Sequence, residues 1–125
     1  ERKIFERARE HGVGSLLHQC GNIRSQISLY PETGADCISI DTGVSIGKVY
    51  ELYHEQLVTA GNVDVINTVF GGETALLCKA VSECVGEISD PYRNYILMPS
   101  CDLPPDTPSR NVEEFLACAD RIIEI

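Results

Sequence analysis

The sequence contains no apolar run that approaches the ~20 residues of a membrane-spanning helix, so it predicts no membrane segment. The first residues, 1–7, lack the apolar core of a signal peptide. An initiator methionine is also absent, so we expect the chain to be a piece of a longer protein. Basic residues are few: the chain has 10 Lys and Arg but 19 Asp and Glu, which gives a net charge of −9. This balance argues against nucleic acid or an anionic membrane as the main partner.

The cysteines lack the spacing of a disulfide framework. There are six, spread from position 20 to position 118, with no Cys-x-x-Cys pair. Disulfide-stapled secreted modules usually crowd their cysteines into chains shorter than about 100 residues. The pattern favours a reducing cytoplasm, with most thiols buried as small hydrophobic groups. We expect such packing roles for the cysteines inside predicted helices and strands, namely Cys37, Cys78, Cys84 and Cys118.

Short apolar runs alternate with helix-like stretches along the chain. With 43% hydrophobic and 23% charged residues, the composition is that of a globular protein. Apolar residues at helical spacing predict helices over 1–11, 23–30, 44–54, 73–88 and 112–124, the second closed by Pro31 and the last capped by Asn111. Apolar runs predict strands over 15–18, 35–40, 56–60 and 95–98, whereas 63–70 has no decisive period.

This order of a helix followed by four β-α units predicts the fold class. Strands that alternate with helices form a parallel sheet with right-handed crossovers, so we expect an α/β fold. No linker divides the chain, so residues 1–125 form a single unit. In such sheets the chemistry lies at the carboxyl ends of the strands. Small and polar residues follow all four predicted strands, at 18–22, 41–43, 61–64 and 100–102.

His18 and Cys20 lie two residues apart at the end of a predicted strand, so their side chains point to one face. An imidazole and a thiolate on one face suit zinc. Cys101 ends another strand and could join them, and three protein ligands would leave the open position of a catalytic zinc site. The alternative is that His18 is a hydrogen-bonded core histidine and that both cysteines only pack.

Two further residues at strand ends are candidates for contact with a substrate. Asp41 follows the second strand and could contact substrate or support a metal ligand, or it could cap the next helix. Asn62 follows the third strand, where it could contact substrate or simply form a turn.

Several of these segments resemble one known family. His18-Gln19-Cys20-Gly21-Asn22 resembles the His-x-Cys-Gly segment of the uroporphyrinogen decarboxylase superfamily, in the branch of methylcobalamin:coenzyme M methyltransferases and their relatives. The run Cys101-Asp102-Leu103-Pro104-Pro105-Asp106-Thr107-Pro108 is similar to that branch's Gly-Cys-Asp-Leu-Pro-Pro-x-Thr-Pro segment, with Ser100 in place of its first Gly. Segments 38–41 and 60–64 also resemble superfamily segments, and the resemblance spans roughly 13–124.

The resemblance implies a fold and a chemistry. The family fold is a (β/α)8 barrel, of which these four units would be the C-terminal half, with 61–72 as a loop over the barrel mouth. Its zinc ligands carry over to His18, Cys20 and Cys101, and the two cysteines would be the catalytic residues. Zinc binding deprotonates a small thiol such as coenzyme M, which then takes a methyl group from a methylated corrinoid. The resemblance thus implies zinc, a corrinoid protein and a small thiol as partners, and an inactive fragment when alone.

Two other functions and an assembly state remain open. A uroporphyrinogen decarboxylase-like enzyme would act on a tetrapyrrole without metal, so its site would not need Cys20 and Cys101. A corrinoid-binding or assembly module typically carries an Asp-x-His-x-x-Gly segment, which this sequence lacks. Half a barrel would leave two strand edges and an apolar face open, so we also expect a homodimer.

Overall fold

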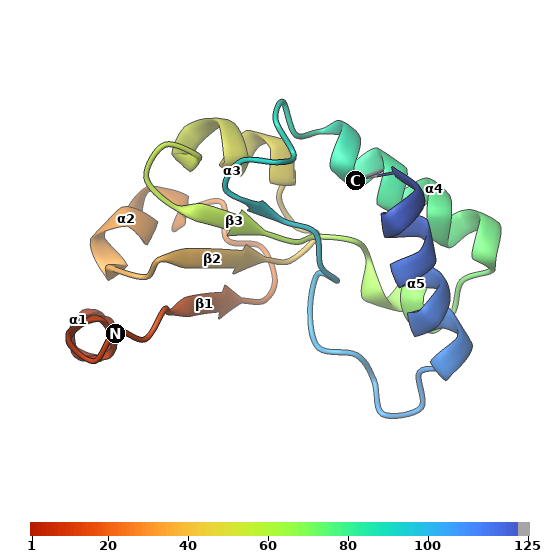
Figure 1. Ribbon diagram of the computed structural model, residues 1–125, viewed down its shortest axis with the longest axis horizontal. Helices are drawn as coiled ribbons and strands as arrows, with labels where there is room; N and C mark the ends of the chain where they lie inside the picture. Colours follow the sequence, from red (N-terminus) through yellow and green to blue (C-terminus); the bar gives the residue numbers. More distant parts are fainter. Residues whose placement is uncertain (123–125) are drawn as a thin grey trace.

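A computed structural model describes residues 1–122, which form one parallel four-stranded sheet with helices between the strands (Figure 1). The strands lie in chain order and are β1 (Leu16–Gln19), β2 (Cys37–Ile40), β3 (Val58–Ala60) and β4 (Tyr95–Ile96). The helices are α1 (Arg2–Glu10), α2 (Tyr30–Thr33), α3 (Ile46–Tyr53), α4 (Thr74–Gly86) and α5 (Ser109–Ile122). The predicted α/β class with four β-α units is confirmed. Within residues 1–122, no helix has the length and apolar character to cross a membrane.

The register of the sheet places alternate rows of side chains on opposite faces, one of which packs against helices. Leu17, Ile38, Thr59 and Tyr95 form one row across the four strands. Ile38 is fully buried in the core, and Tyr95 packs edge-on against Tyr50 of α3. Because side chains alternate along a strand, the next row must face the other way. That next row is His18, Ser39, Ala60 and Ile96.

The predicted helix over 23–30 is wrong. The described chain has a short 3-10 turn, η1 (Ile27–Leu29), followed by α2, so Pro31 opens a helix instead of closing one. Proline fits the first turn of a helix because its missing N–H has no intrahelical partner there. Gly34 ends α2 with a φ of 77°, a conformation that favours glycine.

The predicted mouth loop over 61–72 is also wrong in part. Residues Val65–Phe70 form a π-helix, η2, whose first turn is capped by Asp64 through a 3.0 Å hydrogen bond from the Asn67 N–H. A π-helix follows neither the period of a strand nor that of an α-helix, which explains the ambiguous pattern.

The start of the last helix differs from the prediction as well. The helix α5 begins at Ser109, so Asn111 lies inside it and not at its cap. The Asn111 amide instead donates to Val69 O at 3.0 Å and fastens α5 to the end of η2. Positions 123 and 124 of the predicted helix lie outside the described residues.

Gly47 lies where α3 passes close to the backbone of Glu87. A Cβ atom at position 47 would lie 2.5 Å from Glu87 O, whereas no described residue lies within 4 Å of a Cβ atom at Gly86. We therefore expect Gly47→Ala to lower the free energy of unfolding by about 1–3 kcal/mol. The control Gly86→Ala should change it by less than about 1 kcal/mol. Urea unfolding of both variants measures this, and equal effects would contradict it.

Candidate metal centre

Three potential metal ligands converge where β1 ends and the segment after β4 begins. His18 Nε2 lies 3.1 Å from Cys20 Sγ, and Cys20 Sγ lies 3.1 Å from Cys101 Sγ. The three ligand atoms all lie within 4.8 Å of one another. Cys20 and Cys101 are 81 positions apart in the chain, and the parallel sheet places both at its carboxyl edge. The structure thus brings together the three residues that the sequence singled out.

His18 is oriented by a buried hydroxyl group. Its Nδ1 lies 3.0 Å from Ser39 Oγ on the neighbouring strand, and Ser39 is only 1% exposed. The register pairs these two residues directly across β1 and β2. When one ring nitrogen holds a hydrogen bond, the other is left for a metal, so Nε2 faces the sulfur atoms.

Cys20 has an unfavourable setting for a free thiolate. The hydrogen bond with the Cys101 thiol, partial desolvation and the negative charges of Cys101, Asp41 and Asp102 raise the pKa of Cys20 to about 11. In the absence of a cation, two adjacent thiolates and two nearby carboxylates repel one another. The same negative charges favour a divalent cation between the sulfur atoms.

The donor set fits zinc. Two cysteine sulfurs and one imidazole nitrogen are borderline-soft ligands, and a three-ligand set leaves one tetrahedral position open. A Zn–S bond of about 2.3 Å in tetrahedral geometry separates two sulfurs by about 3.8 Å. The Cys20 and Cys101 sulfurs lie 3.1 Å apart, so they would move apart by about 0.7 Å to bind zinc in that geometry. Cys20 is exposed and Cys101 is partly exposed, so an ion can reach both.

Asp41 binds the loop that carries Cys20. Its carboxylate accepts from the Gly21 N–H at 2.8 Å and from the Thr42 N–H at 2.7 Å. Burial by itself would raise the pKa of Asp41, but the donors around the carboxylate hold its pKa below the usual value. The alternative that Asp41 caps the next helix is wrong, because Ser45 caps α3. Its contact with substrate stays a prediction.

The Asn62 side chain joins two of the loops at the carboxyl ends of the strands. Its side-chain amide donates to Val44 O at 2.8 Å and to Asp41 O at 3.1 Å, which ties the end of β3 to the segment after β2. A contact between Asn62 and substrate stays a prediction.

Sequence reasoning missed Ser39 and the role of Ser100. The signal for Ser39 was available, because pairing the first two strands in parallel puts it on the same face as His18. Ser100 replaces a glycine of the resembling segment and is 3% exposed. Its N–H donates to Val63 O at 2.8 Å, and its Oγ accepts from the Val65 N–H at 3.4 Å. These bonds fix the backbone just before Cys101.

We expect Ser39→Ala to weaken metal binding about 10- to 100-fold, because loss of an outer-shell hydrogen bond frees the imidazole ring. Ser39→Thr, which keeps the hydroxyl, should retain most of the affinity. Zinc competition with a chromophoric chelator measures both variants. Equal losses in the two variants would show that packing at position 39, and not the hydroxyl, matters.

Comparisons with known proteins identify the family of the chain. The model of the uroporphyrinogen decarboxylase (URO-D) family matches residues 1–122. The chain belongs to this family. The chain is 30% identical over 122 residues to the methylcobamide:CoM methyltransferase MtbA of Methanosarcina acetivorans. It is 28% identical over 123 residues to the MtbA of Methanosarcina mazei.

The chain spans about a third of the length of these curated relatives. Each match covers 95% of the chain but 33% of the relative. A solved structure, a methyltransferase from Methanosarcina mazei, matches 95% of the chain and 34% of its own length, with a TM-score of 0.79 and 22% identity. That protein is a TIM barrel, so the four β-α units have the fold of part of such a barrel. Their place as its C-terminal half stays a prediction.

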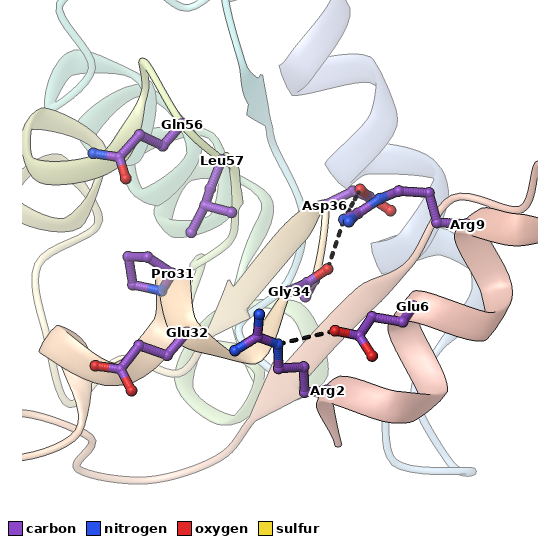
Figure 2. Close-up of a pocket in the computed structure, with 10 residues that line it drawn as sticks. Arg2, Glu6, Arg9, Pro31, Glu32, Gly34, Asp36, Gln56 and Leu57 are labelled. Atoms are coloured by element: carbon purple, nitrogen blue, oxygen red, sulfur yellow. Dashed lines mark hydrogen bonds and ion pairs between the residues drawn. The ribbon is translucent and has the colours of Figure 1, made fainter.

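A hollow of about 580 Å³ lies away from the candidate metal centre, at the amino-terminal ends of β2 and β3 (Figure 2). Four of its charged groups are already paired, since Arg9 contacts Asp36 at 2.9 Å and Arg2 contacts Glu6 at 3.0 Å. Hydrogen bonds from the Ser15 hydroxyl and from Arg9 lower the pKa of Asp36 to about 2. In barrels of this type, chemistry lies at the carboxyl face, so we assign this hollow to stability.

Proposed function

We propose that this chain carries the zinc centre of a corrinoid-dependent thiol methyltransferase. His18, Cys20 and Cys101 would hold the zinc, and the whole protein would move a methyl group from a methylated corrinoid to a small thiol such as coenzyme M. The observation that carries the proposal is the convergence of one imidazole nitrogen and two cysteine sulfurs within 4.8 Å at the carboxyl edge of the sheet. The substrate class is supported by the two curated relatives, which are named as methylcobamide:CoM methyltransferases.

The residues of the chain prepare this site in three ways. Ser39 directs His18 Nε2 towards the sulfurs, and the two cysteines supply negative charge that offsets the charge of a divalent ion. Asp41 holds the Gly21 backbone next to Cys20, which keeps the loop in place. Bound zinc would keep a small thiol in its thiolate form, which is the nucleophile.

A second candidate, a metal-free decarboxylase acting on a tetrapyrrole, is less favoured. Such an enzyme has no use for two sulfurs 3.1 Å apart beside an imidazole. The two curated relatives are methyltransferases by name. Metal analysis separates the candidates, because only the methyltransferase needs zinc.

The proposal is tested on the whole protein that contains this chain, with methylcobalamin as methyl donor and a panel of small thiols as acceptors. We expect a methylated thiol from the wild type and a loss of more than about 100-fold in Cys101→Ala, as for other groups that contact the reacting atoms. The matched control Asp106→Asn changes an exposed residue of the same proline-rich segment and should keep the activity. Unchanged activity in Cys101→Ala would reject the function.

Two more properties accompany the proposal. Leu16 and Ile96 are 47% and 46% exposed, so two copies of the chain could pair through the open sheet. A strictly monomeric chain at micromolar concentration, measured by light scattering, would reject that pairing. We also propose that the chain alone is inactive, since the curated relatives are about three times its length. The wide spacing of the cysteines in the sequence supports the further proposal that the protein is cytoplasmic.

A further inference from the structure

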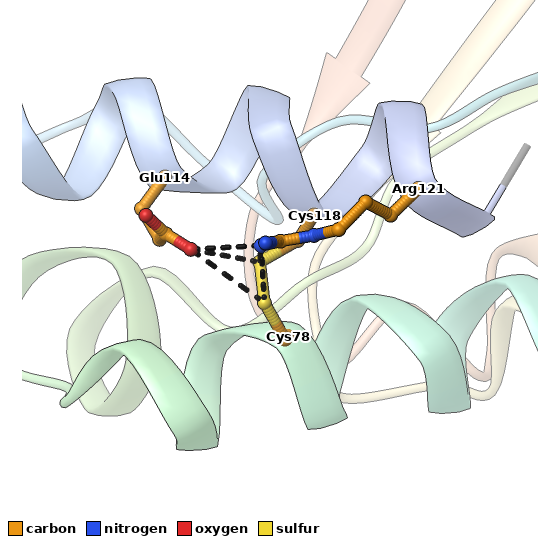
Figure 3. The surroundings of a disulfide bond; sticks show 4 residues. All are labelled: Cys78, Glu114, Cys118 and Arg121. Atoms are coloured by element: carbon orange, nitrogen blue, oxygen red, sulfur yellow. Dashed lines mark hydrogen bonds and ion pairs between the residues drawn. A yellow bond between two sulfur atoms is a disulfide. The ribbon is translucent and has the colours of Figure 1, made fainter.

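Helices α4 and α5 are joined by a disulfide bond between Cys78 and Cys118 (Figure 3). The two cysteines are 40 positions apart, and their Cα atoms are 5.1 Å apart. This finding corrects the expectation that both are packing thiols, whereas Cys37 and Cys84 are indeed buried and free. The bond links the helix that follows the Cys101 segment to the helix before β4.

The two sulfur-bearing residues differ in how well solvent reaches them. Cys118 is 1% exposed and belongs to the hydrophobic core. Cys78 is partly exposed on the outer side of that core. A reagent from solution therefore meets Cys78 first.

A cation and a carboxylate flank the disulfide. Arg121 Nη2 lies 3.2 Å from Cys78 Sγ and 3.3 Å from Cys118 Sγ, and it also donates to Glu114 Oε1 at 2.8 Å. Glu114 Oε1 lies 4.0 Å from Cys78 Sγ and 3.9 Å from Cys118 Sγ. A guanidinium group beside a sulfur stabilises a departing thiolate, and a better leaving group speeds thiol–disulfide exchange. The carboxylate offers an acceptor for a reduced thiol.

We propose that Cys78 is a thiol–disulfide exchange site at which small thiols open the bond between α4 and α5. The thiolate of a small thiol attacks Cys78 Sγ, the bond to Cys118 Sγ breaks, and its electron pair leaves on Cys118 as a thiolate beside Arg121. A second thiolate attacks the mixed disulfide on Cys78 and releases it as a thiolate. The small thiol is oxidised to its disulfide, both cysteines are reduced, and each takes up a proton from water.

Opening the bond removes a covalent tie of α5 to the rest of the chain. At its first turn, α5 is held by the Asn111 amide on Val69 O, and further along by the disulfide. The segment that carries Cys101 leads directly into α5. The concentration of small thiols would therefore set how firmly α5 is held. This inference does not depend on the proposed methyl-transfer function.

The order of attack is tested with glutathione and two variants that each lack one cysteine of the disulfide. In Cys118→Ser, oxidised glutathione should add to Cys78, and peptide mass mapping should find one glutathionyl group on the peptide that carries Cys78. In Cys78→Ser, the buried Cys118 should react at least about tenfold more slowly. Equal labelling of the two variants, or preferred labelling of Cys118, would overturn the proposal.

The role of Arg121 is tested by the rate at which reduced glutathione opens the disulfide at pH 7.5. Arg121→Gln should slow the reaction at least about threefold. Arg110→Gln, an exposed arginine on the same helix, serves as matched control and should not change the rate. An unchanged rate in Arg121→Gln would overturn the role of the guanidinium. A metal site formed by Cys78, Glu114 and Cys118 is the competing interpretation. It would be supported if the reduced Cys20→Ser variant still binds zinc and the double variant Cys20→Ser/Cys78→Ser does not, and this result would overturn the proposal.

Discussion

Cys101→Ser should lower the affinity of the chain for zinc by more than about 100-fold, because even outer-shell changes at zinc sites cost about 10- to 100-fold. A serine hydroxyl stays protonated at neutral pH and is a poor replacement for a soft thiolate. With Cys101 gone, only His18 Nε2 and Cys20 Sγ remain of the three converging ligand atoms. Competition with a chromophoric chelator at pH 7.5, under reduction, measures the affinity.

A buried cysteine outside the site provides the control for this experiment. Cys37 is free and 7% exposed in β2, so Cys37→Ala removes a thiol without touching the three ligand atoms. We expect it to change zinc affinity less than about threefold, within the scatter of neutral substitutions. Affinity of the wild type should fall as pH falls, because protons compete for both sulfurs. A wild-type chain that binds no zinc, or a Cys101→Ser chain that binds it normally, would reject the centre.

The metal-free chain should show an unusually unreactive Cys20. The hydrogen bond with the neighbouring Cys101 thiol makes the largest contribution to the rise in the pKa of Cys20 from the ordinary 9.0 to about 11. The thiolate is the reactive form, so at pH 7 alkylation of Cys20 by iodoacetamide should be about 100-fold slower than that of an unperturbed thiol. The alkylation rate should rise about tenfold per pH unit and level off only near pH 11. Peptide mass mapping after timed alkylation measures it.

Removal of the neighbouring thiol tests the cause. In Cys101→Ala the hydrogen bond and the nearby sulfur charge are gone, so the pKa of Cys20 should fall towards its ordinary value. Alkylation at pH 7 should then speed up, although the carboxylates of Asp41 and Asp102 still oppose the thiolate. A Cys20 rate that levels off near pH 9 in the wild type would contradict the expected environment.

Local patterns in the sequence were enough for the order of elements and for the candidate ligands. Apolar runs of four to six residues, each followed by small polar residues, predict parallel strands and place the chemistry at their carboxyl ends. His18 and Cys20 share a face because a strand repeats every two residues. Cys101 entered the same site only as a possibility, since spacing alone does not bring together residues 81 positions apart.

The local patterns failed where a stretch of sequence fits more than one structure. Pro31 is compatible with both the end and the start of a helix, and the structure places it at the start of α2. The π-helix η2 has no simple period, and its amide partners come from the loop itself and from the Cys101 segment.

The sequence by itself determined the fold class, the order of the strands and the types of the candidate ligands, because these depend on residue periodicity and side-chain chemistry. It did not place the end of the fourth strand, since β4 ends at Ile96 and Cys101 follows five residues later. The tertiary structure alone decided that Ser39 orients His18 and that the sulfurs of Cys20 and Cys101 meet at 3.1 Å. It also decided that Cys78 and Cys118 bond across α4 and α5. The physical reason is that contacts between distant residues follow from sheet register and helix packing, which no short stretch of sequence contains.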